Sequence, residues 1–582
     1  MWSQDVRKVW LVGFLLLVAG MPALASDSAA TNQIKVNQVG YLPAAQKLAT
    51  VPASGGDRFA VVRPDTQEPV YQGTLGPAAT WPYSEESVRI ADFSAFTQPG
   101  VYRLRVEGLP DSPLFHIASD AYRDLNRAAI KAFYFNRAST ELLPEHAGIY
   151  ARPAGHPDDR VKVHWSAASE ERPEGTVISA PKGWYDAGDY NKYIVNSGIT
   201  MHSLLSAYEH FPELYRKQDL NIPESGDGVP DLLNEILWNL EWMFDMQDPH
   251  DGGVYHKLTT ERFQDPVMPH VPTAQRYVVT KGTAAALNFA AVMAQASRVY
   301  ADYDSHFPGL SERALQAAEH AWVWAQENPD ITYTNPDGVV TGQYGDQTLD
   351  DEFAWAAAEL YITTGKDDYY RAMNPTEVAN VVPAWPEVRG LAWMSLAHHR
   401  DSLTELADGD LIAARVTGLA DQLLQVWRES AYRVVMQRNN FVWGSNSVAL
   451  NNAMMLIQGY RLTGNRDYLN AAQSNLDYVL GRNPTDFSFV TGHGSKTPMH
   501  IHHRVSEADG IENPVPGFIA GGPQPGQQDL GDCVDDYQTE YPSNLPAKSF
   551  LDHWCSYASN EVAINWNAPL VYVSGALQVL TR

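Results

Sequence analysis

Two aspartates, Asp186 and Asp189, lie three residues apart among aromatic residues and glycines, between Gly183 and Tyr193. On a turn, this spacing lets both carboxylates face one water molecule, and one of them can then act as a general base. Two acids that cap the start of a helix would show the same spacing, and most Asp-x-x-Asp pairs have that simpler explanation. The pair is therefore a candidate for acid–base chemistry, provided that an acid lies opposite it.

A glutamate near the C-terminus, Glu561, is the candidate for that opposite role. It is expected to begin an apolar helix, and it stands among aromatic residues that include Tyr557 and Trp566. Burial in such surroundings raises the pKa of a carboxyl group, which then stays protonated near neutral pH and can donate a proton. The alternative is an ordinary glutamate in a first helical turn, stabilised by the helix dipole.

Three histidines, His500, His502 and His503, precede Arg504. No carboxylate or thiol stands at a helical ligand spacing beside them, which disfavours a metal site. Histidine and arginine side chains near a cleft can instead donate hydrogen bonds to sugar hydroxyls, so we interpret His502 and Arg504 as sugar-binding candidates. The remaining candidates for substrate binding are two aromatic residues, Tyr557 and Trp443.

The composition limits the classes of partner. The chain has 582 residues, of which 44% are hydrophobic and 19% charged, as in soluble globular proteins of more than one domain. Its formal net charge of −27 repels phosphate backbones and anionic membrane surfaces, so nucleic acid is not an expected partner. A neutral substrate is compatible with this charge. For the oligomeric state, we expect a monomer.

The N-terminus has the features of a signal peptide. Arg7 and Lys8 precede an apolar run over residues 9–19, and Ala23-Leu24-Ala25 provides a cleavage site. The run is shorter than the roughly 20 apolar residues of a membrane anchor. We therefore predict a signal peptide over residues 1–25 and a mature protein that is secreted or periplasmic and does not stay in the membrane.

Export also bears on the two cysteines of the chain, Cys533 and Cys555. An exported protein meets an oxidising compartment, so we predict that they form a disulfide. Two thiolates are too few to make a structural zinc site by themselves.

The pattern of hydrophobic residues divides the chain into two domains. Over residues 32–118, short alternating segments such as Val101–Val106 are separated by turn signals, which predicts a small β-sandwich. This segment holds a single tryptophan, Trp81, so we expect it to be structural and not to bind glycans. Over residues 120–582, apolar residues recur at helical spacing, which predicts about a dozen helices.

A weak internal repeat indicates that these helices form hairpins. Tyr361-x-x-Thr-Gly365 recurs as Tyr460-x-x-Thr-Gly464, and each glycine is placed to end one helix shortly before the next begins. Repeated helical hairpins of this kind build a toroid. The long Gly/Pro-rich stretch over residues 505–531 is expected to build part of a binding cleft.

Together, four motifs resemble those of glycoside hydrolase family 9, in particular its members with an N-terminal immunoglobulin-like domain. The motifs are Lys35–Leu42, Asp186–Asp189, His502–Arg504, and Asn560–Ala563 followed by Asn565–Ala568. The resemblance covers nearly the whole chain after the predicted signal peptide. It implies a multidomain fold, with an immunoglobulin-like β-sandwich over residues 32–118 followed by an all-α (α/α)6 barrel over residues 120–582.

The resemblance also implies an inverting glycoside hydrolase of the endoglucanase type. Its substrates would be cellulose, soluble β-glucan or cellodextrins, cleaved at β-1,4-glucosidic bonds without a cofactor. Asp189 would be the general base, Asp186 its partner in holding the water, and Glu561 the proton donor, while His502 and Arg504 would bind sugar. No carbohydrate-binding module follows the second domain, which favours soluble glucan over crystalline cellulose.

Two alternatives stay open. An exo-acting cellodextrinase, β-glucosidase or exo-β-glucosaminidase of the same family would share these motifs. A non-catalytic glucan-binding protein would not need both Asp189 and Glu561, and it is disfavoured for that reason.

The resemblance extends less well to metals. Relatives often hold zinc through cysteines that follow the sandwich, but residues 135–156 contain none, so zinc is not expected. Calcium is common in the family, and Asp350, Asp351 and Glu352, beside Asp346, offer the oxygen ligands that it prefers. A solvated acidic helix start would explain the same residues, and both interpretations stay open.

Overall fold

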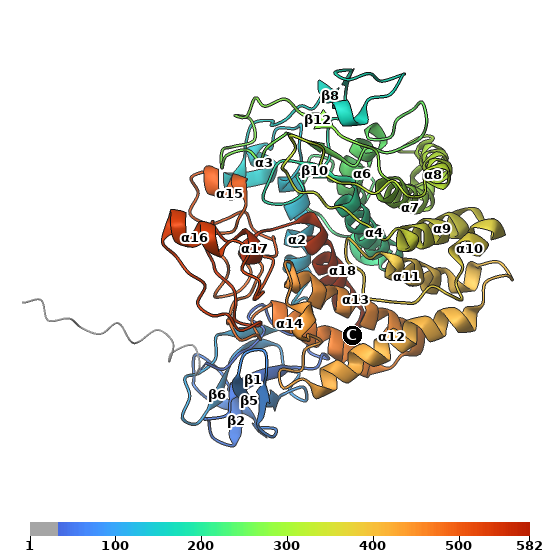
Figure 1. Cartoon of the computed structure of the whole chain (residues 1–582). Coiled ribbons are helices and arrows are strands. Elements are labelled where there is room, and N and C mark those ends of the chain that lie inside the picture. The colour runs from blue at the N-terminus through green and yellow to red at the C-terminus, as the bar shows by residue number, and fades with distance from the viewer. Residues whose placement is uncertain (1–32, 582) are drawn as a thin grey trace, which may run out of the picture.

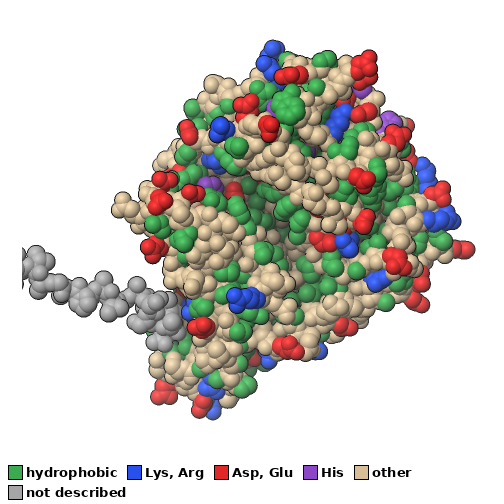
Figure 2. Space-filling model, viewed as in Figure 1, with side chains coloured by type: hydrophobic (Ala, Val, Ile, Leu, Met, Phe, Trp, Pro, Cys, Tyr) green, Lys and Arg blue, Asp and Glu red, His purple; other side chains and the backbone are tan. Residues whose placement is uncertain are grey.

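The computed structural model describes residues 33–581, and the predicted signal peptide lies outside them. Figure 1 shows a small β domain at one end of a larger helical domain. None of the helices within residues 33–581 is long and apolar enough to cross a membrane. On the face shown in Figure 2, acidic side chains are spread among basic and hydrophobic ones, so the large negative charge is not gathered into one patch there.

The β domain is a sandwich of two antiparallel sheets. One sheet has the strand order β1 (Leu48–Pro52), β5 (Glu86–Asp92), β4 (Ala79–Trp81). The other has the order β3 (Pro69–Thr74), β2 (Arg58–Val62), β6 (Gly100–Val106), β7 (Phe115–Ile117). Every second side chain of β6, namely Tyr102, Leu104 and Val106, is buried in the sandwich core, as the alternating sequence predicts.

The helical domain is a double ring made by twelve helices of the described residues. Contacts between neighbours close an inner ring in the order α4, α7, α9, α11, α13, α18 and back to α4. These inner helices are α4 (Ile194–His210), α7 (Thr283–Tyr300), α9 (Asp350–Thr364), α11 (Arg389–His399), α13 (Ser445–Thr463) and α18 (Ile564–Leu580). The outer helices are α2 (Arg123–Phe135), α6 (Asp231–Asp245), α8 (Leu310–Glu327), α10 (Asp367–Met373), α12 (Gly409–Glu429) and α14 (Arg466–Val479).

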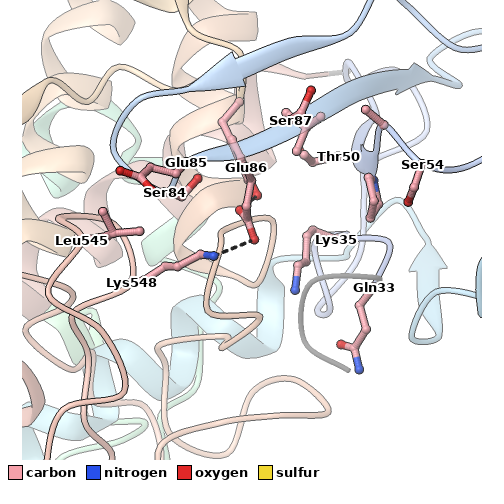
Figure 3. A pocket seen from close by; sticks show the side chains of 14 residues that line it. Gln33, Lys35, Thr50, Ser54, Ser84, Glu85, Glu86, Ser87, Leu545 and Lys548 are labelled. Atoms are coloured by element: carbon pink, nitrogen blue, oxygen red, sulfur yellow. Dashed lines mark hydrogen bonds and ion pairs between the residues drawn. The ribbon is translucent and has the colours of Figure 1, made fainter. Parts of the chain in front are cut away.

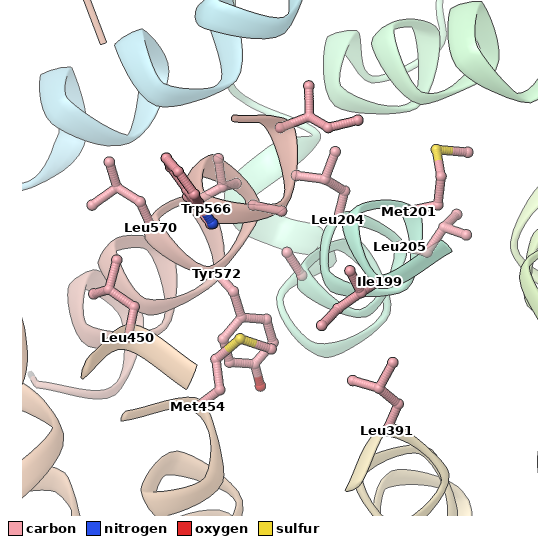
Figure 4. Packing of buried hydrophobic residues seen from close by; sticks show 14 of the residues in the cluster. Ile199, Met201, Leu204, Leu205, Leu391, Leu450, Met454, Trp566, Leu570 and Tyr572 are labelled. Atoms are coloured by element: carbon pink, nitrogen blue, oxygen red, sulfur yellow. The ribbon is translucent and has the colours of Figure 1, made fainter. Parts of the chain in front are cut away.

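Outer and inner helices alternate along the chain. The ring closes because the last inner helix, α18, packs against the first inner helix, α4, and against the first outer helix, α2. Every residue of α4 from Ile194 to Tyr208 is buried, whereas α12 buries only one face. Figure 4 shows the centre of the ring, where hydrophobic side chains of α4, α11, α13 and α18 pack together. The predicted fold class, an immunoglobulin-like sandwich followed by an (α/α)6 barrel, is confirmed.

The repeated motifs end two inner helices. Gly365 follows α9 with φ 68°, and Gly464 follows α13 with φ 72°. This left-handed conformation suits glycine because it has no Cβ. An outer helix begins directly after each glycine, so the predicted helical hairpins are confirmed.

A small sheet accompanies the barrel, and the helical pattern of the sequence did not predict it. Its strand order is β10 (Lys192–Tyr193), β11 (Lys257–Thr259), β12 (Tyr277–Val278), β8 (Val161–Val163), β9 (Val177–Ile178). Strands of two or three residues are too short to show an alternating pattern. The shorter helices are α3 (Pro144–Ala147), α5 (Pro212–Tyr215), α15 (Arg504–Ala508), α16 (Leu530–Tyr537) and α17 (Tyr557–Asn560).

The sandwich contacts the barrel through Trp81, which is 2% exposed. Its ring centroid lies 4.7 Å from that of Tyr432 and 6.5 Å from that of Tyr478. A pocket of about 430 Å³ lies between the two domains (Figure 3), and in it Lys548 Nζ lies 3.3 Å from Glu86 Oε1. The tryptophan of the sandwich is thus buried in the domain interface and offers no exposed face to a sugar.

Candidate active site

A cavity of about 830 Å³ lies at the end of the barrel where α4, α13 and α18 begin. Six of the predicted site residues line it: Asp189, Glu561, His502, Arg504, Tyr557 and Trp443. Further aromatic side chains in its wall are Phe263, Tyr344, Trp385 and Trp566. The structure therefore brings the predicted catalytic and sugar-binding residues together from segments that are far apart in the sequence.

Asp189 is the aspartate that borders the cavity. Its Oδ2 accepts hydrogen bonds from Asn191 Nδ2 and, at 3.1 Å, from Tyr193 OH. No described residue donates to Oδ1, which leaves that oxygen available to a water molecule. Burial raises the pKa of Asp189, while the charge of Arg504 and the two hydrogen bonds act in the opposite direction.

Asp186 lies behind Asp189 and is fully buried. Asn196 Nδ2 donates to its two oxygens at 3.1 and 3.0 Å, and Tyr344 OH donates at 3.0 Å. Burial and the charge of Asp189 raise the pKa of Asp186 well above its usual value, and these donors oppose that shift. The carbonyl of Asp186 accepts from the Ile564 N–H at 2.8 Å, which joins this loop to the start of α18.

Glu561 lies between α17 and α18, so the prediction that it begins a helix is wrong. Its backbone is extended, with φ −67° and ψ 159°, and it forms a β-bridge with His502. The Gly521 N–H donates to its carbonyl at 2.8 Å. The backbone of Glu561 thus makes its hydrogen bonds to two other loops and does not need those of a helix. This explains why Glu561 is extended although the sequence predicts a helix.

Burial has the largest effect on the pKa of the Glu561 carboxyl group, and its neighbours add smaller effects: Asp189 raises the pKa, whereas Arg504 and the Gly188 N–H lower it. Burial, followed by the charge of Asp189, raises the pKa of Glu561 to about 8. The Gly188 N–H donates to Oε1 at 3.3 Å. The carboxyl group is therefore protonated at neutral pH and held against the loop that carries Asp189.

His502 and Arg504 are fixed by backbone carbonyls. His502 Nδ1 lies 2.7 Å from the Trp554 carbonyl and must donate to it, so Nε2 of the neutral ring is an acceptor. Burial lowers the pKa of His502 to about 4, which keeps the ring neutral at pH 7. Arg504 donates from Nε to the Gln264 carbonyl at 2.7 Å and from Nη1 to the Gly188 carbonyl at 2.8 Å.

Tyr557 and Trp443 form an aromatic pair in the cavity wall, with ring centroids 5.5 Å apart. Trp443 is 41% exposed. Tyr557 OH donates to Asp532 Oδ2 at 3.2 Å. Asp532 lies on α16. A disulfide between Cys533 and Cys555 joins this helix to the segment that precedes Tyr557. The disulfide is the pairing that the sequence analysis predicts.

Sequence reasoning assigned no role to the residues that hold the two aspartates. Tyr193 lies inside the quoted aspartate motif, so its position was visible although its contact was not. Asn196 and Tyr344 carry no motif signal. The stretch over residues 505–531 supplies none of the residues that line the cavity, contrary to expectation, and instead backs the loop of Glu561.

The acidic residues at the start of α9 have some features of a cation site. Both side-chain oxygens of the buried Glu352, and Oδ1 of the buried Asp351, have no hydrogen-bond partner. Burial and the carboxylates of Asp351 and Asp346 raise the pKa of Glu352 well above its usual value. Asp350 is exposed. Across residues 33–581, however, no group of three or more His, Cys, Asp or Glu side chains is arranged to hold a metal, so backbone oxygens or waters would have to complete a calcium shell.

Comparison with known proteins shows which family the chain belongs to. The model of glycosyl hydrolase family 9 matches residues 122–574, and that of the cellulase N-terminal ig-like domain matches residues 29–111. A xyloglucan-specific endo-beta-1,4-glucanase of Bacteroides ovatus is 41% identical over 589 residues, covering 99% of this chain and 98% of the relative. Endoglucanase D of Acetivibrio thermocellus is 33% identical over 551 residues, covering 93% of this chain and 82% of the relative.

A solved structure from Bacteroides ovatus, named GH9, is similar with a TM-score of 0.88 and 40% identity, covering 95% of this chain and 100% of that chain. The matches thus include both domains and at least 82% of the length of these relatives. The chain belongs to glycosyl hydrolase family 9 and is a glycoside hydrolase of the endo-β-1,4-glucanase type with an N-terminal immunoglobulin-like domain.

Proposed function

We propose that the enzyme hydrolyses β-1,4-glucosidic bonds with inversion at the anomeric carbon. Glu561 donates its proton to the glycosidic oxygen as the bond from that oxygen to C1 breaks. Asp189 takes a proton from a water molecule whose oxygen attacks C1 from the opposite face, and Asp186 is its partner in orienting that water. The products are a free 4-hydroxyl group and a new reducing end in the α configuration.

The observation that carries this proposal is the difference in protonation state between two carboxyl groups, those of Glu561 and Asp189, in one cavity. The pKa of Glu561, raised to about 8, keeps it protonated at pH 7. Burial raises the pKa of Asp189, and against this the two donated hydrogen bonds and the attraction of Arg504 favour its charged form. One protonated and one charged carboxyl group are what acid and base catalysis of the same bond require.

For the substrate, we propose a soluble β-1,4-glucan that is cut within the chain, outside the cytoplasm. The wall of the cavity offers several rings to neutral pyranose units, among them Trp385, Trp443 and Trp566. Xyloglucan is the first polymer to test, because the Bacteroides ovatus relative is named for it. Cellulose, mixed β-glucan and cellodextrins are the comparison substrates.

The mechanism is tested by variants that keep the shape of each carboxyl group. Asp189→Asn and Glu561→Gln should each lower turnover by roughly 10²-fold or more. An aryl glycoside with an activated leaving group needs little protonation, so it should partly rescue Glu561→Gln and not Asp189→Asn. Proton NMR of the first-formed product should show the α-anomer. The β-anomer appearing first would show retention and overturn the proposal.

We also propose that calcium binds at Asp351 and Glu352 and stabilises the start of α9. The support is the set of buried carboxylate oxygens without partners. A chelator should lower the melting temperature, and calcium but not magnesium should restore it. Glu352→Gln should lose both the bound calcium, measured by mass spectrometry, and the response to the chelator. An unchanged melting temperature and no bound metal would refute this site.

A further inference from the structure

A second groove lies next to the catalytic cavity. It is formed by the loop from Thr260 to Tyr277 and has a volume of about 510 Å³. This is within the range of about 300–1,000 Å³ that is usual for small-molecule sites. Phe263 borders both the groove and the catalytic cavity, so the two spaces adjoin at this side chain.

Aromatic side chains lie at two places in the groove and continue beside it. Phe263, 46% exposed, lies at the near end, and Tyr277 lines the groove. The His164 ring lies 5.5 Å from the Tyr277 ring and 5.3 Å from that of Trp165. Trp165 does not line the groove itself, but its ring is 52% exposed, whereas the His164 ring that contacts both is buried. Large exposed rings beside a groove are more often found at binding sites than elsewhere on a surface.

The backbone holds the far end of this row in place. β12, which contains Tyr277, pairs in parallel with β8, and the His164 N–H donates to the Val278 carbonyl at 3.0 Å. The His164 side chain accepts from the Ser166 N–H at 3.3 Å and so starts the short helical turn that carries Trp165. The backbone that carries these rings is therefore held in place before any ligand binds, which lowers the entropy lost on binding.

The polar side chains of the groove indicate which sugars it would accept. Glu261, Arg262 and Asp265 line it and are exposed. These charged groups can exchange hydrogen bonds with hydroxyl groups, and their balance of two acids to one base disfavours carboxylated or sulfated sugars. Neutral pyranose rings, which pack their C–H faces against aromatic rings, fit both features.

We propose that this groove binds a neutral glycosyl unit of the substrate that lies beyond the units held in the catalytic cavity, with Tyr277 as its stacking surface and Trp165 as a further ring beside the groove. The proposal rests on the proposed glucanase function. The unit has two sources, a continuation of the main chain or a branch on it. Both present the same pyranose chemistry to the groove.

The test uses Trp165→Ala, with Val323→Ala as a control because Val323 is also an exposed hydrophobic residue, 50% exposed, and lies on α8 outside the groove. We would compare kcat/KM on cellotriose, on a long unbranched soluble glucan and on xyloglucan. Trp165→Ala should leave cellotriose hydrolysis unchanged. It should lower kcat/KM about fivefold or more on at least one polymer, as expected for the loss of one stacking contact. A loss on the unbranched polymer identifies the main chain, and a loss on xyloglucan alone identifies a branch.

Retardation of the full-length protein in native gels that contain each polymer measures binding separately from catalysis. Weaker retardation of Trp165→Ala than of both the wild type and Val323→Ala supports the groove. This holds even if the wild type cleaves neither polymer, because that result would refute only the proposed function. Equal retardation of all three proteins would overturn the groove proposal. A similar loss of activity on cellotriose and on the polymers would also overturn it, because the change would then act on the catalytic cavity.

Discussion

The backbone N–H of Gly188 lies 3.3 Å from Oε1 of Glu561, although 373 positions separate the two residues in the sequence. The carbonyl of Gly188 accepts a hydrogen bond from Arg504 Nη1 at 2.8 Å. A Cβ at position 188 would lie 2.4 Å from the carbonyl oxygen of His502 and 3.1 Å from the same Glu561 oxygen. The absence of a side chain at this glycine therefore lets the loop of Asp189 approach Glu561, His502 and Arg504 closely.

Gly188→Ala should disrupt this approach. The clash is with backbone, so one of the loops has to move, and a displacement of about 1 Å between reacting groups lowers the rate about 10²-fold. We expect kcat on a soluble glucan to fall by that order. Gly418→Ala is the control, since Gly418 lies in α12 with no atom within 4 Å of an added Cβ. A Gly188→Ala enzyme with near-normal kcat would show that the close approach is not needed.

The alkaline side of the pH profile should report Glu561. Its pKa is raised to about 8 by burial and by the charge of Asp189, and the general acid acts only while it is protonated. We therefore expect kcat/KM to fall as the pH rises through about 8. Glu561→Gln, assayed on an activated aryl glycoside, should lose this alkaline limb. If the limb persists in that variant, another group causes it.

A histidine pair at the other end of α4 should make the fold sensitive to acid. Arg461 donates to Nδ1 of His210 at 2.6 Å and to Nδ1 of His398 at 2.8 Å, so both rings must be neutral acceptors. Burial, followed by the charge of Arg461, lowers the pKa of His398 to about 4 and that of His210 well below its usual value. Between pH 6.5 and about 4 the unfolded chain therefore binds protons that the folded chain does not, and the free energy of unfolding decreases as the pH falls.

His398→Gln keeps an acceptor for Arg461 and removes one titrating group. Urea unfolding over this pH range should give a slope that is smaller than in the wild type by up to about 1.4 kcal/mol per pH unit. The exposed His306 provides the control variant, His306→Gln, which should keep the wild-type slope. Equal slopes for all three proteins would refute the role of His398.

Opening the disulfide should weaken substrate binding as well as the fold. The bond between Cys533 and Cys555 holds α16, whose Asp532 accepts from Tyr557 OH, close to the segment that carries Trp554 and Tyr557. We expect Cys533→Ser/Cys555→Ser to raise KM more than it lowers kcat, and to lower the free energy of unfolding by about 3 kcal/mol. Thiol titration of the unreduced, denatured wild type should find no free thiol. Two free thiols, or an unchanged KM in the double variant, would contradict this prediction.

The sequence predicts the barrel because its helices are long and periodic, and because Gly365 and Gly464 mark where two of them end. Compact motifs mark Asp186, Asp189 and Glu561 as candidate catalytic residues, and the resemblance to a family supplies their proposed roles. The sequence does not reveal that Tyr344 donates to Asp186, since that contact spans 158 positions and depends on how two loops pack. The same limit explains the wrong helix start at Glu561, where pairing with His502 replaces the local preference for a helix.

Trp81→Ala should separate the structural role of the sandwich from substrate binding. Trp81 is 2% exposed and packs on barrel residues Tyr432, Phe441 and Tyr478. Removing its ring leaves a cavity in the interface and should lower the free energy of unfolding by about 3–5 kcal/mol, measured by urea denaturation. KM on soluble glucan should stay unchanged, because Trp81 does not line the catalytic cavity. Val101→Ala, at a position 38% exposed on β6, should change neither quantity. A Trp81→Ala protein of normal stability but raised KM would show instead that the sandwich takes part in binding glucan.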